Sequence, residues 1–380
     1  MLKGIKLVRT VPFYVIIHIT FFCEVNDMSA LTEKQMEARK EFFQQPINQI
    51  SIPENMTVRS LMENFAGMSI QARNIGTAAK IWETMLLDED RPAVFLGMAG
   101  PLIAAGLRNV ICDMVRKNYV DVVVSTGAII YQDYLYARGH NHYRGTPFVD
   151  DTELGKLRID RIYDVFTDDL AFEDTDDYIS RICDEMRPGI YSSREFMIEL
   201  SKTIDDKNSI LKTCVDMEKP VFIPAINDSS IGIGILKHWA RNKEGARVTI
   251  DSIKDNHEMV NTIMQSNVTS AVYIGGGVPK NFINDAVVMA NFDFGANSEG
   301  HKYAIQVSTA TPIDGGLSGS TLSEAITWGK IEHSAKKANV YQEVSIGLPL
   351  LFAYLNDNKR ISQRNSLKFD FDIELKEVAD

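Results

Sequence analysis

Short apolar runs alternate with helix-like segments along most of this 380-residue chain. Runs such as VVVS and YAIQV contain few polar residues, which is typical of strands that are buried on both faces of a sheet. Amphipathic segments such as residues 101–118 separate them. This alternation predicts an α/β fold with a doubly wound, mainly parallel sheet. The expected strands are residues 93–97, 120–126, 220–226, 270–276, 303–309 and 339–345.

The segments after these runs are the expected wall of a ligand site, because ligands bind beyond the carboxyl ends of parallel strands. They are rich in Gly, Ser and Thr, which let backbone amides approach a phosphate closely. The chain contains no GxGxxG motif, so the pattern alone leaves nucleotide binding and simple turn geometry both open. The segments are residues 97–101, 125–133, 226–232, 275–281 and 308–320.

Charge and cysteine usage exclude several classes of partner. The formal net charge of −11 argues against nucleic acid or an anionic membrane as a main partner. The four cysteines form no CxxC pair, which favours reduced thiols in a cytoplasmic protein. The pair His140 and His142 has no third ligand at metal-binding spacing, so no metal site is predicted.

The N-terminal segment does not fit a membrane span. Basic residues precede an apolar run that ends at Cys23 and is too short to cross a bilayer. We interpret residues 1–27 as an upstream extension before a natural start at Met28, with a targeting segment as the alternative. The expected organisation continues with a helical arm (28–90), an α/β domain (91–360) and a C-terminal tail (361–380).

The segment TLSEAITWGKIE, residues 321–332, combines an apolar helical pattern with a lysine. As a helix it would bury Ala325, Ile326, Trp328 and Ile331. Lys330 is then either an ordinary surface lysine or an amine held in a pocket where it does chemistry.

Several motifs together identify a family resemblance. SEAITWGKI (323–331), GGGVPK (275–280) and VYQEVSIGLPLL (340–351) stand in an order that resembles the deoxyhypusine synthase family from about residue 90 to 355. The resemblance implies an NAD-dependent, Rossmann-like enzyme that transfers an aminobutyl group from spermidine through an imine on a lysine. Lys330 matches that lysine. An amine reacts in this way only when it is neutral, which desolvation beside Trp328 would favour.

The resemblance also assigns binding roles to other positions. The expected amine-binding residues are Asp314, Ser318, Glu324 and Trp328. The expected NAD-binding residues are Thr126, Gly127, Ala128, Asp228, Gly275, Gly276, Gly277, Thr309, Ala310 and Glu343, the last replacing an aspartate near the adenosine. Turn geometry remains an equal explanation for the glycines and threonines, and a helix N-cap for Asp228.

The chain departs from the family where the polyamine should lie. The family's Ser-Asn pair is Gly100-Pro101, two acids are replaced by Ile233 and Leu317, and a histidine is replaced by Asn281. A further acid is replaced by Gln132, beside a preserved Asp133. Burying an ammonium without a paired acid costs several kcal/mol, so spermidine in the family's pose is disfavoured.

We therefore predict that the imine chemistry is retained and that the substrate has changed. The donor is expected to be a shorter or less charged amine, or a guanidino compound such as agmatine, and the acceptor a small amine. The family further implies a homotetramer with sites between subunits. Two alternatives remain open: a catalytically silent NAD- or amine-binding protein with a regulatory role, and a dehydrogenase without covalent catalysis.

Overall fold

The computed structural model describes residues 31–296 and 298–376, and it divides into two compact units at Ile47/Asn48. The described part of the first unit carries α1 (Glu33–Phe42), which starts with a capping box between Thr32 and Gln35. None of the residues of α1 is buried. The expected upstream extension, residues 1–27, lies outside the described residues.

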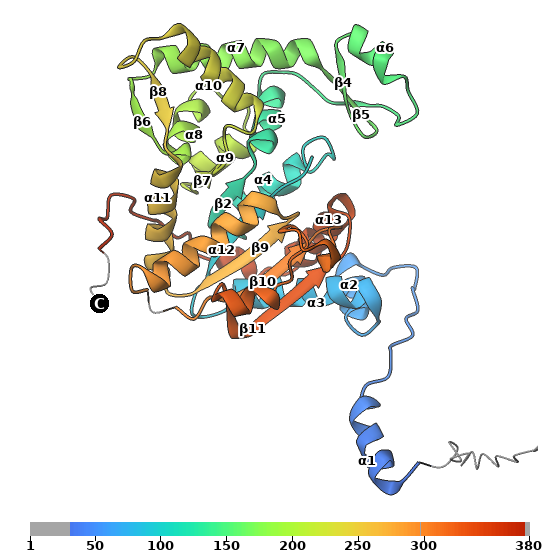
Figure 1. Ribbon diagram of the computed structural model, residues 1–380. Coiled ribbons are helices and arrows are strands. Elements are labelled where there is room, and N and C mark those ends of the chain that lie inside the picture. Colours follow the sequence, from blue (N-terminus) through green and yellow to red (C-terminus); the bar gives the residue numbers. More distant parts are fainter. Residues whose placement is uncertain (1–30, 297, 377–380) are drawn as a thin grey trace, which may run out of the picture. The chain divides into compact units, whose positions relative to one another are not determined.

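The second unit is built on a six-stranded sheet in which all neighbouring strands are parallel (Figure 1). The strand order is β11-β10-β9-β1-β2-β7. The first three strands along the chain extend in one direction from β1 and the last three in the other, so the order reverses between β1 and β9. This confirms the predicted doubly wound fold. The strands are β1 (Ala93–Met98), β2 (Val122–Ser125), β7 (Val221–Phe222), β9 (Thr269–Ile274), β10 (His301–Val307) and β11 (Ile331–Val340).

Helices cover both faces of this sheet. Successive residues of a strand point to opposite faces, so apolar strands leave an apolar surface on each face that helices bury. Val94 and Leu96 of β1 belong to one apolar cluster and Phe95 to the other. The first cluster includes residues of α3 (Ile70–Leu87), α4 (Arg108–Arg116) and α13 (Val344–Asn356). The second includes residues of α11 (Ser252–Met264) and α12 (Gly277–Phe292). The core therefore has two layers, one on each side of the sheet.

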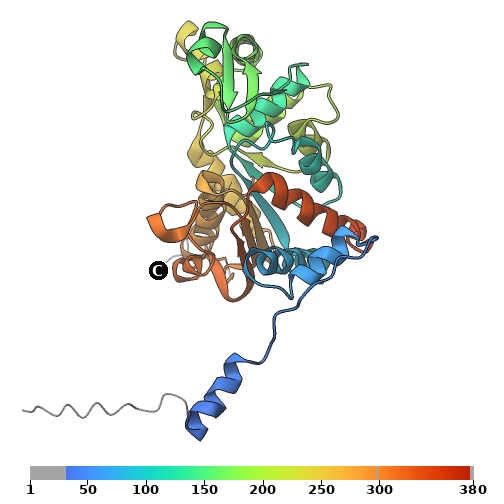
Figure 2. The ribbon, with the colours of Figure 1, turned by 90° about the vertical axis from the view of Figure 1, so that its right-hand side faces the viewer.

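The helices between residues 58 and 87 belong to the second unit. Helix α3 packs against β10 and β11, and α2 (Val58–Phe65) packs against α3 and α13 (Figure 2). Met62 of α2 and Trp82 of α3 are fully buried. The structure thus divides the chain after Ile47, whereas the sequence suggested an arm that extends to residue 90.

A second group of elements lies between β2 and β9 along the chain. Two small sheets occur here, with strand orders β3-β5-β4 and β6-β8. The strands are β3 (Tyr143–Arg144), β4 (Ile159–Ile162), β5 (Val165–Asp168), β6 (Gly189–Tyr191) and β8 (Val248–Ile250). The helices are α5 (Gly127–Ala137), α6 (Asp151–Lys156), α7 (Asp169–Glu185), α8 (Ser193–Ser201), α9 (Ile210–Asp216) and α10 (Ser230–Arg241).

Two sequence predictions of local structure were wrong. The last strand spans Ile331–Val340 and not residues 339–345, since Glu343 already accepts a hydrogen bond from Ser345 N and caps α13. The segment 321–332 is not one helix. It forms a short 3₁₀ helix (Glu324–Trp328) and ends at Gly329, whose φ of +68° is costly for residues with a side chain.

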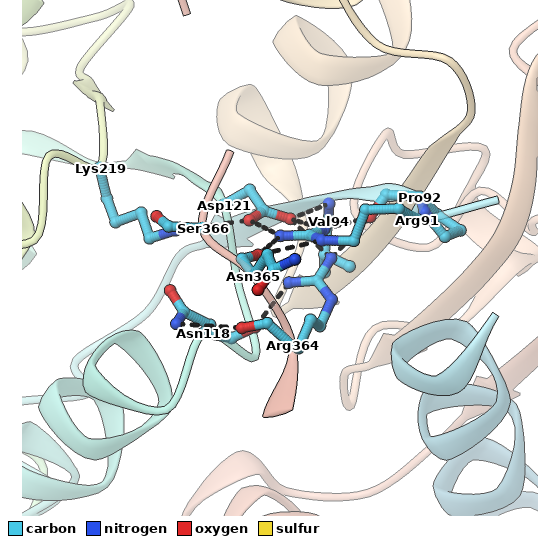
Figure 3. Close-up of polar contacts among 9 residues, drawn as sticks. All are labelled: Arg91, Pro92, Val94, Asn118, Asp121, Lys219, Arg364, Asn365 and Ser366. Atoms are coloured by element: carbon cyan, nitrogen blue, oxygen red, sulfur yellow. Dashed lines mark hydrogen bonds and ion pairs between the residues drawn. The ribbon is translucent and has the colours of Figure 1, made fainter. Parts of the chain in front are cut away.

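The C-terminal segment is fixed to the body by a buried carboxylate at the amino ends of β1 and β2. Asp121 accepts hydrogen bonds from Arg91 at 2.9 Å, Arg364 at 2.7 Å and Val94 N at 3.0 Å, and Lys219 lies 3.4 Å away (Figure 3). Burial raises the pKa of Asp121, but the arginines and Lys219 outweigh it and lower the pKa to about 2. Arg364 therefore holds the residues that follow α13 against the amino ends of β1 and β2.

Across residues 31–296 and 298–376, no helix has both the length and the apolarity needed to cross a bilayer. Within the same ranges, Cys112, Cys183 and Cys214 are buried and are not joined by disulfides.

Candidate active site

The glycine turn after β9 lies at the switch point of the sheet, between the ends of β1 and β9. Gly275 has φ of +84°, and a Cβ there would lie 2.6 Å from the carbonyl oxygen of Ala99, which follows β1. Gly276 is equally confined, because its Cβ would lie 2.6 Å from Cα of Ser318. Gly277 has φ of +62° and begins α12. Only residues without side chains fit this turn.

The predicted Thr-Gly-Ala turn and the turn after β7 meet. Thr126 occupies the N-cap position of α5 without a capping hydrogen bond from its side chain, and a Cβ on Gly127 would lie 2.2 Å from Oγ of Ser229. Asp228 is exposed in the same turn, and the N-cap of α10 is Ser229, so the alternative reading of Asp228 as a cap was wrong. The structure therefore brings Thr126, Gly127, Ala128 and Asp228 to one edge of the sheet.

Glu343 borders a cavity of about 630 Å³ at this edge. The cavity is also lined by the loop after β1, including Pro101 and Gly106, by β3 and by the turn that joins β4 to β5. Burial raises the pKa of Glu343, but hydrogen bonds from Ser345 and the following backbone amides outweigh it and hold the pKa below its ordinary value. Thr309 and Ala310 follow β10, next to the chain that leads from β11 to Glu343. The carboxylate is thus charged and faces open space.

The loop that carries Asp314 and Ser318 is anchored by a lysine that sequence reasoning did not select. Nζ of Lys280 donates to the carbonyl of Ser320 at 2.6 Å, to its hydroxyl at 2.9 Å and to Oε1 of Gln306 at 3.0 Å. Lys280 is 1% exposed, and burial lowers its pKa to about 8 despite attraction from Glu324. Asp314 is exposed and accepts a hydrogen bond from Gly316 N. The anchored loop lies over the first turns of α12.

Lys330 reaches α12 from the start of β11. Its Nζ lies 3.0 Å from Oδ1 of Asn281 and 3.0 Å from Oδ1 of Asp285, and its side chain is 16% exposed. Asn281 and Asp285 line a cavity of about 260 Å³ together with Leu317. Asn281 is four residues along α12 from Gly277, a rise of about 6 Å. The amine of Lys330 therefore contacts two residues of the cavity wall, about one helical turn from the glycine turn.

The surroundings of Lys330 differ from those expected. Trp328 was predicted to be buried, but it is 65% exposed because the chain reverses at Gly329. Its ring centroid lies 5.6 Å from Nζ of Lys330, a distance that permits a weak cation–π contact. Ala325 and Ile331 are buried as predicted. The amine is thus ion-paired with Asp285 and is not surrounded by apolar groups. Glu324 is exposed within electrostatic reach of Lys280.

The replaced positions fall into two groups. Leu317 and Asn281 lie in the wall of the cavity beside Lys330. Ile233 lies on α10, 47% exposed, and Gln132 is buried in α5. Asp133 is held by Arg108 at 2.6 Å and Ser209 at 2.7 Å, so this preserved acid is used in packing.

Asp285 is the second residue that sequence reasoning missed. The sequence could have indicated Asp285 through its spacing from Asn281, because residues four apart on a helix lie on the same face. Lys280 had a signal as well, as the last residue of the GGGVPK motif.

These features define an α/β protein with the strand order that dinucleotide-binding proteins use and a lysine-centred site beside its switch point. Comparison with known proteins agrees. The family model "DS: Deoxyhypusine synthase" matches residues 60–355. A deoxyhypusine synthase-like protein of Chlorobaculum tepidum is 41% identical over 353 residues, which cover 92% of this chain and 99% of the relative.

Two further comparisons give the same family. A relative from Methanosarcina mazei, named "Probable deoxyhypusine synthase 2", is 37% identical over 332 residues, covering 86% of this chain and 95% of the relative. A crystal structure from Entamoeba histolytica, described under the name deoxyhypusine synthase, superposes with a TM-score of 0.55 at 16% identity and covers 81% of this chain and 96% of its own. The latter supports the fold alone.

The chain belongs to the deoxyhypusine synthase family. It is a transferase of the class that moves alkyl groups other than methyl, as the sequence predicted.

Proposed function

We propose that this protein is an NAD-dependent aminoalkyl transferase that carries an amine-derived group as an imine on Lys330. The observation that carries the proposal is the contact of Nζ of Lys330 with two residues that line a cavity, Asn281 and Asp285, each at 3.0 Å. A small molecule in that cavity would therefore lie next to the two residues that bind the amine of Lys330. The donor is a polyamine-type amine and the acceptor a small amine.

The residues at the carboxyl edge fit a dinucleotide. The turn at Gly275 and Gly276 leads into the N-terminus of α12, whose unpaired backbone N–H groups favour a phosphate. Glu343 presents a charged carboxylate to the cavity, suited to ribose hydroxyls. Thr126, Gly127, Ala128, Asp228, Gly277, Thr309 and Ala310 would complete this NAD site. Bound NAD would accept a hydride from the amine and return it to the final imine.

The residues around Lys330 would handle the amine. Glu324 offers an exposed carboxylate for an ammonium, and Trp328 an aromatic face for an aliphatic chain. Asp314 and Ser318 lie on the loop that Lys280 anchors beside the glycine turn. Neutral Lys330 attacks the carbon of the substrate imine, the original amine leaves with a proton, and the acceptor amine later displaces Lys330 in the same way.

Exposed apolar side chains border this site and support an assembly. Ile313 is 91% exposed, Phe292 74% and Trp328 65%. Large exposed apolar groups of this kind mark interaction surfaces. We propose that they are covered by a second copy of the chain in a homotetramer, so that each site lies between two subunits. A cytoplasmic location remains a prediction from the cysteine content.

Trapping the imine tests the proposal. The protein is incubated with NAD and single amines, reduced with borohydride and analysed by peptide mass spectrometry. We expect an aminoalkyl adduct on Lys330 that requires both NAD and the amine, and no adduct with Lys330→Arg. Lys302→Arg is the matched control, at a partly exposed lysine that pairs with Asp88 and Asp90, and should keep the adduct. Intact NAD binding without an adduct from any polyamine, diamine or guanidino amine contradicts the proposal and favours a silent binding protein.

A further inference from the structure

Lys330, Asn281 and Asp285 form a closed polar triangle. Nζ of Lys330 lies 3.0 Å from Oδ1 of Asp285 and 3.0 Å from Oδ1 of Asn281. The amide nitrogen of Asn281 donates to the other carboxylate oxygen of Asp285 at 2.6 Å. Both oxygens of Asp285 therefore have a partner, and one of the two partners is the lysine expected to react.

This pairing opposes the reaction assigned to Lys330. A carboxylate next to an ammonium favours the charged form of the amine. A lysine that attacks an imine has to be neutral. In the resting site, Lys330 is thus engaged in an ion pair with Asp285, and some event has to separate the two before Lys330 can attack.

The cavity indicates which molecule can separate them. Asp285 is its only charged lining residue within the described parts of the chain. Val278, Phe282, Met289 and Leu317 make the rest of the wall mainly apolar. The side chain of Asp285 is 46% exposed, so a ligand can reach it. The cavity of about 260 Å³ suits a short aliphatic chain that ends in a cation.

Two other charged groups act on this place. Lys280 of α12 lies within electrostatic reach of Lys330, and its positive charge disfavours a second ammonium nearby. Glu324, on the 3₁₀ helix before Lys330, attracts Lys280. If the counter-charge of Asp285 were taken by a ligand, Lys330 would face the cations of Lys280 and of that ligand.

We propose that Asp285 is the specificity-determining residue of this site, exchanging Lys330 for the distal cation of the amine substrate and so releasing the lysine for attack. This inference rests on the proposed function. It narrows the donor to amines with two cationic centres, one that is oxidised at Lys330 and one that pairs with Asp285. Monoamines would leave the resting ion pair intact.

The exchange balances in charge and atoms. The substrate's distal ammonium replaces the lysine ammonium at Asp285, and Lys330 releases one proton to solvent. The lone pair of Nζ then attacks the carbon of the imine that NAD-dependent oxidation has formed. The bond from that carbon to the departing amine breaks as the C=N bond to Nζ forms. A proton passes from Nζ to the departing nitrogen, so no further oxidant is required.

The test measures the reactivity of Lys330 without turnover. Trace acetic anhydride labels the protein between pH 6 and 10, and peptide mass spectrometry compares Lys330 with the same residue in the unfolded chain. We expect Asp285→Asn to lower the midpoint pH of labelling by about one unit. Tetramethyl-1,4-diaminobutane, a dication that the reagent does not consume, should shift the wild type in the same direction. It should have no effect on Asp285→Asn, and the monocation dimethylbutylamine should have none on either protein.

Asp293→Asn is the matched control, because it removes a carboxylate from the C-terminal end of the same helix, two turns further on. Its midpoint should equal that of the wild type. Equal midpoints in Asp285→Asn and the wild type overturn the inference, as does an equal shift by the monocation. Since labelling requires neither NAD nor catalysis, a shift without a borohydride adduct defeats the proposed function, and an adduct without a shift defeats only this inference.

Discussion

Ser318 lies directly against the backbone of Gly276, so closely that a Cβ on the glycine would come within 2.6 Å of Cα of Ser318. This contact joins the turn at the switch point of the sheet to the loop that carries Asp314. Because both partners are backbone atoms, neither can move aside as a flexible side chain would. The glycine turn and the loop therefore act as one structural element.

Replacing Gly276 with alanine should push the glycine turn and the loop at Ser318 apart. We expect the free energy of unfolding to fall by about 1–3 kcal/mol from overpacking. The affinity for NAD should fall at least tenfold if the turn binds the dinucleotide. Denaturant unfolding and calorimetric titration with NAD measure the two effects.

The control is Gly155→Ala in α6, where no atom lies within 4 Å of the added Cβ. That variant should not lower the free energy of unfolding and should raise it by up to about 1 kcal/mol, because alanine favours a helix more than glycine does. An unchanged affinity of Gly276→Ala for NAD would remove the turn from the proposed dinucleotide site.

Lys280 should give stability an unusual pH dependence. Its pKa is lowered to about 8 in the folded protein from 10.5, so between pH 8 and 10.5 the unfolded chain binds more protons and stability rises with pH. Relative to Lys280→Met, the wild type should gain up to about 3 kcal/mol across this range. Urea unfolding of both proteins at pH 7, 8, 9 and 9.5 measures the difference.

Lys302 provides the opposite case. The hydrogen bonds that its ammonium donates to Asp88 and Asp90 raise the pKa of Lys302, so its contribution to stability is lost only as the pH rises. The difference between wild type and Lys302→Met should therefore not grow with pH. A difference between wild type and Lys280→Met that stays constant from pH 7 to 9.5 would contradict a buried, easily deprotonated Lys280.

The buried carboxylate Asp121 should be essential for stability and irrelevant to chemistry. Asp121→Asn leaves Arg91, Arg364 and Lys219 without their counter-charge, and we expect a loss of about 3–5 kcal/mol. Its pKa is lowered to about 2, so its contribution is present above pH 4 and is lost between pH 4 and 2. Guanidinium unfolding at pH 7 and acid titration followed by circular dichroism measure both effects.

Asp113→Asn is the comparison, since Asp113 is 47% exposed in a pair with Arg116 three residues away. That pair should contribute less than about 1 kcal/mol. Equal losses in the two variants would mean that the Asp121 cluster does not hold the C-terminal segment.

Sequence patterns predicted the central sheet because a strand buried on both faces, such as Val122–Ser125, has few alternatives. They also selected the glycine turn, where composition follows from backbone geometry at Gly275 and Gly276. The path of residues 321–332 was not predictable in this way, because apolar spacing indicated a helix while the positive φ of Gly329 ended it. A single glycine carries no signal of the φ it adopts.

Contacts between residues that lie far apart in the sequence could not be predicted either. Lys330 and Asp285 are 45 positions apart and meet because β11 starts beside α12. Without that arrangement, the neighbouring Trp328 and an expected helix before it suggested a desolvated amine. The sequence also did not show that the preserved Asp133 is fixed by Arg108 and Ser209.

Trp328 offers a direct test of the assembly. Within one chain its indole is 65% exposed, whereas Trp82 is fully buried. If a second subunit covers the site, iodide should not quench Trp328 in the assembled protein, with Trp328→Phe used to subtract the other tryptophans. Ile313→Asp, which places a charge on a 91% exposed apolar position beside the site, should weaken assembly in light scattering. The same change should make Trp328 accessible to iodide. A wild-type monomer at micromolar concentration, or an indole that iodide quenches fully in the assembled protein, would show that the site is complete within one chain.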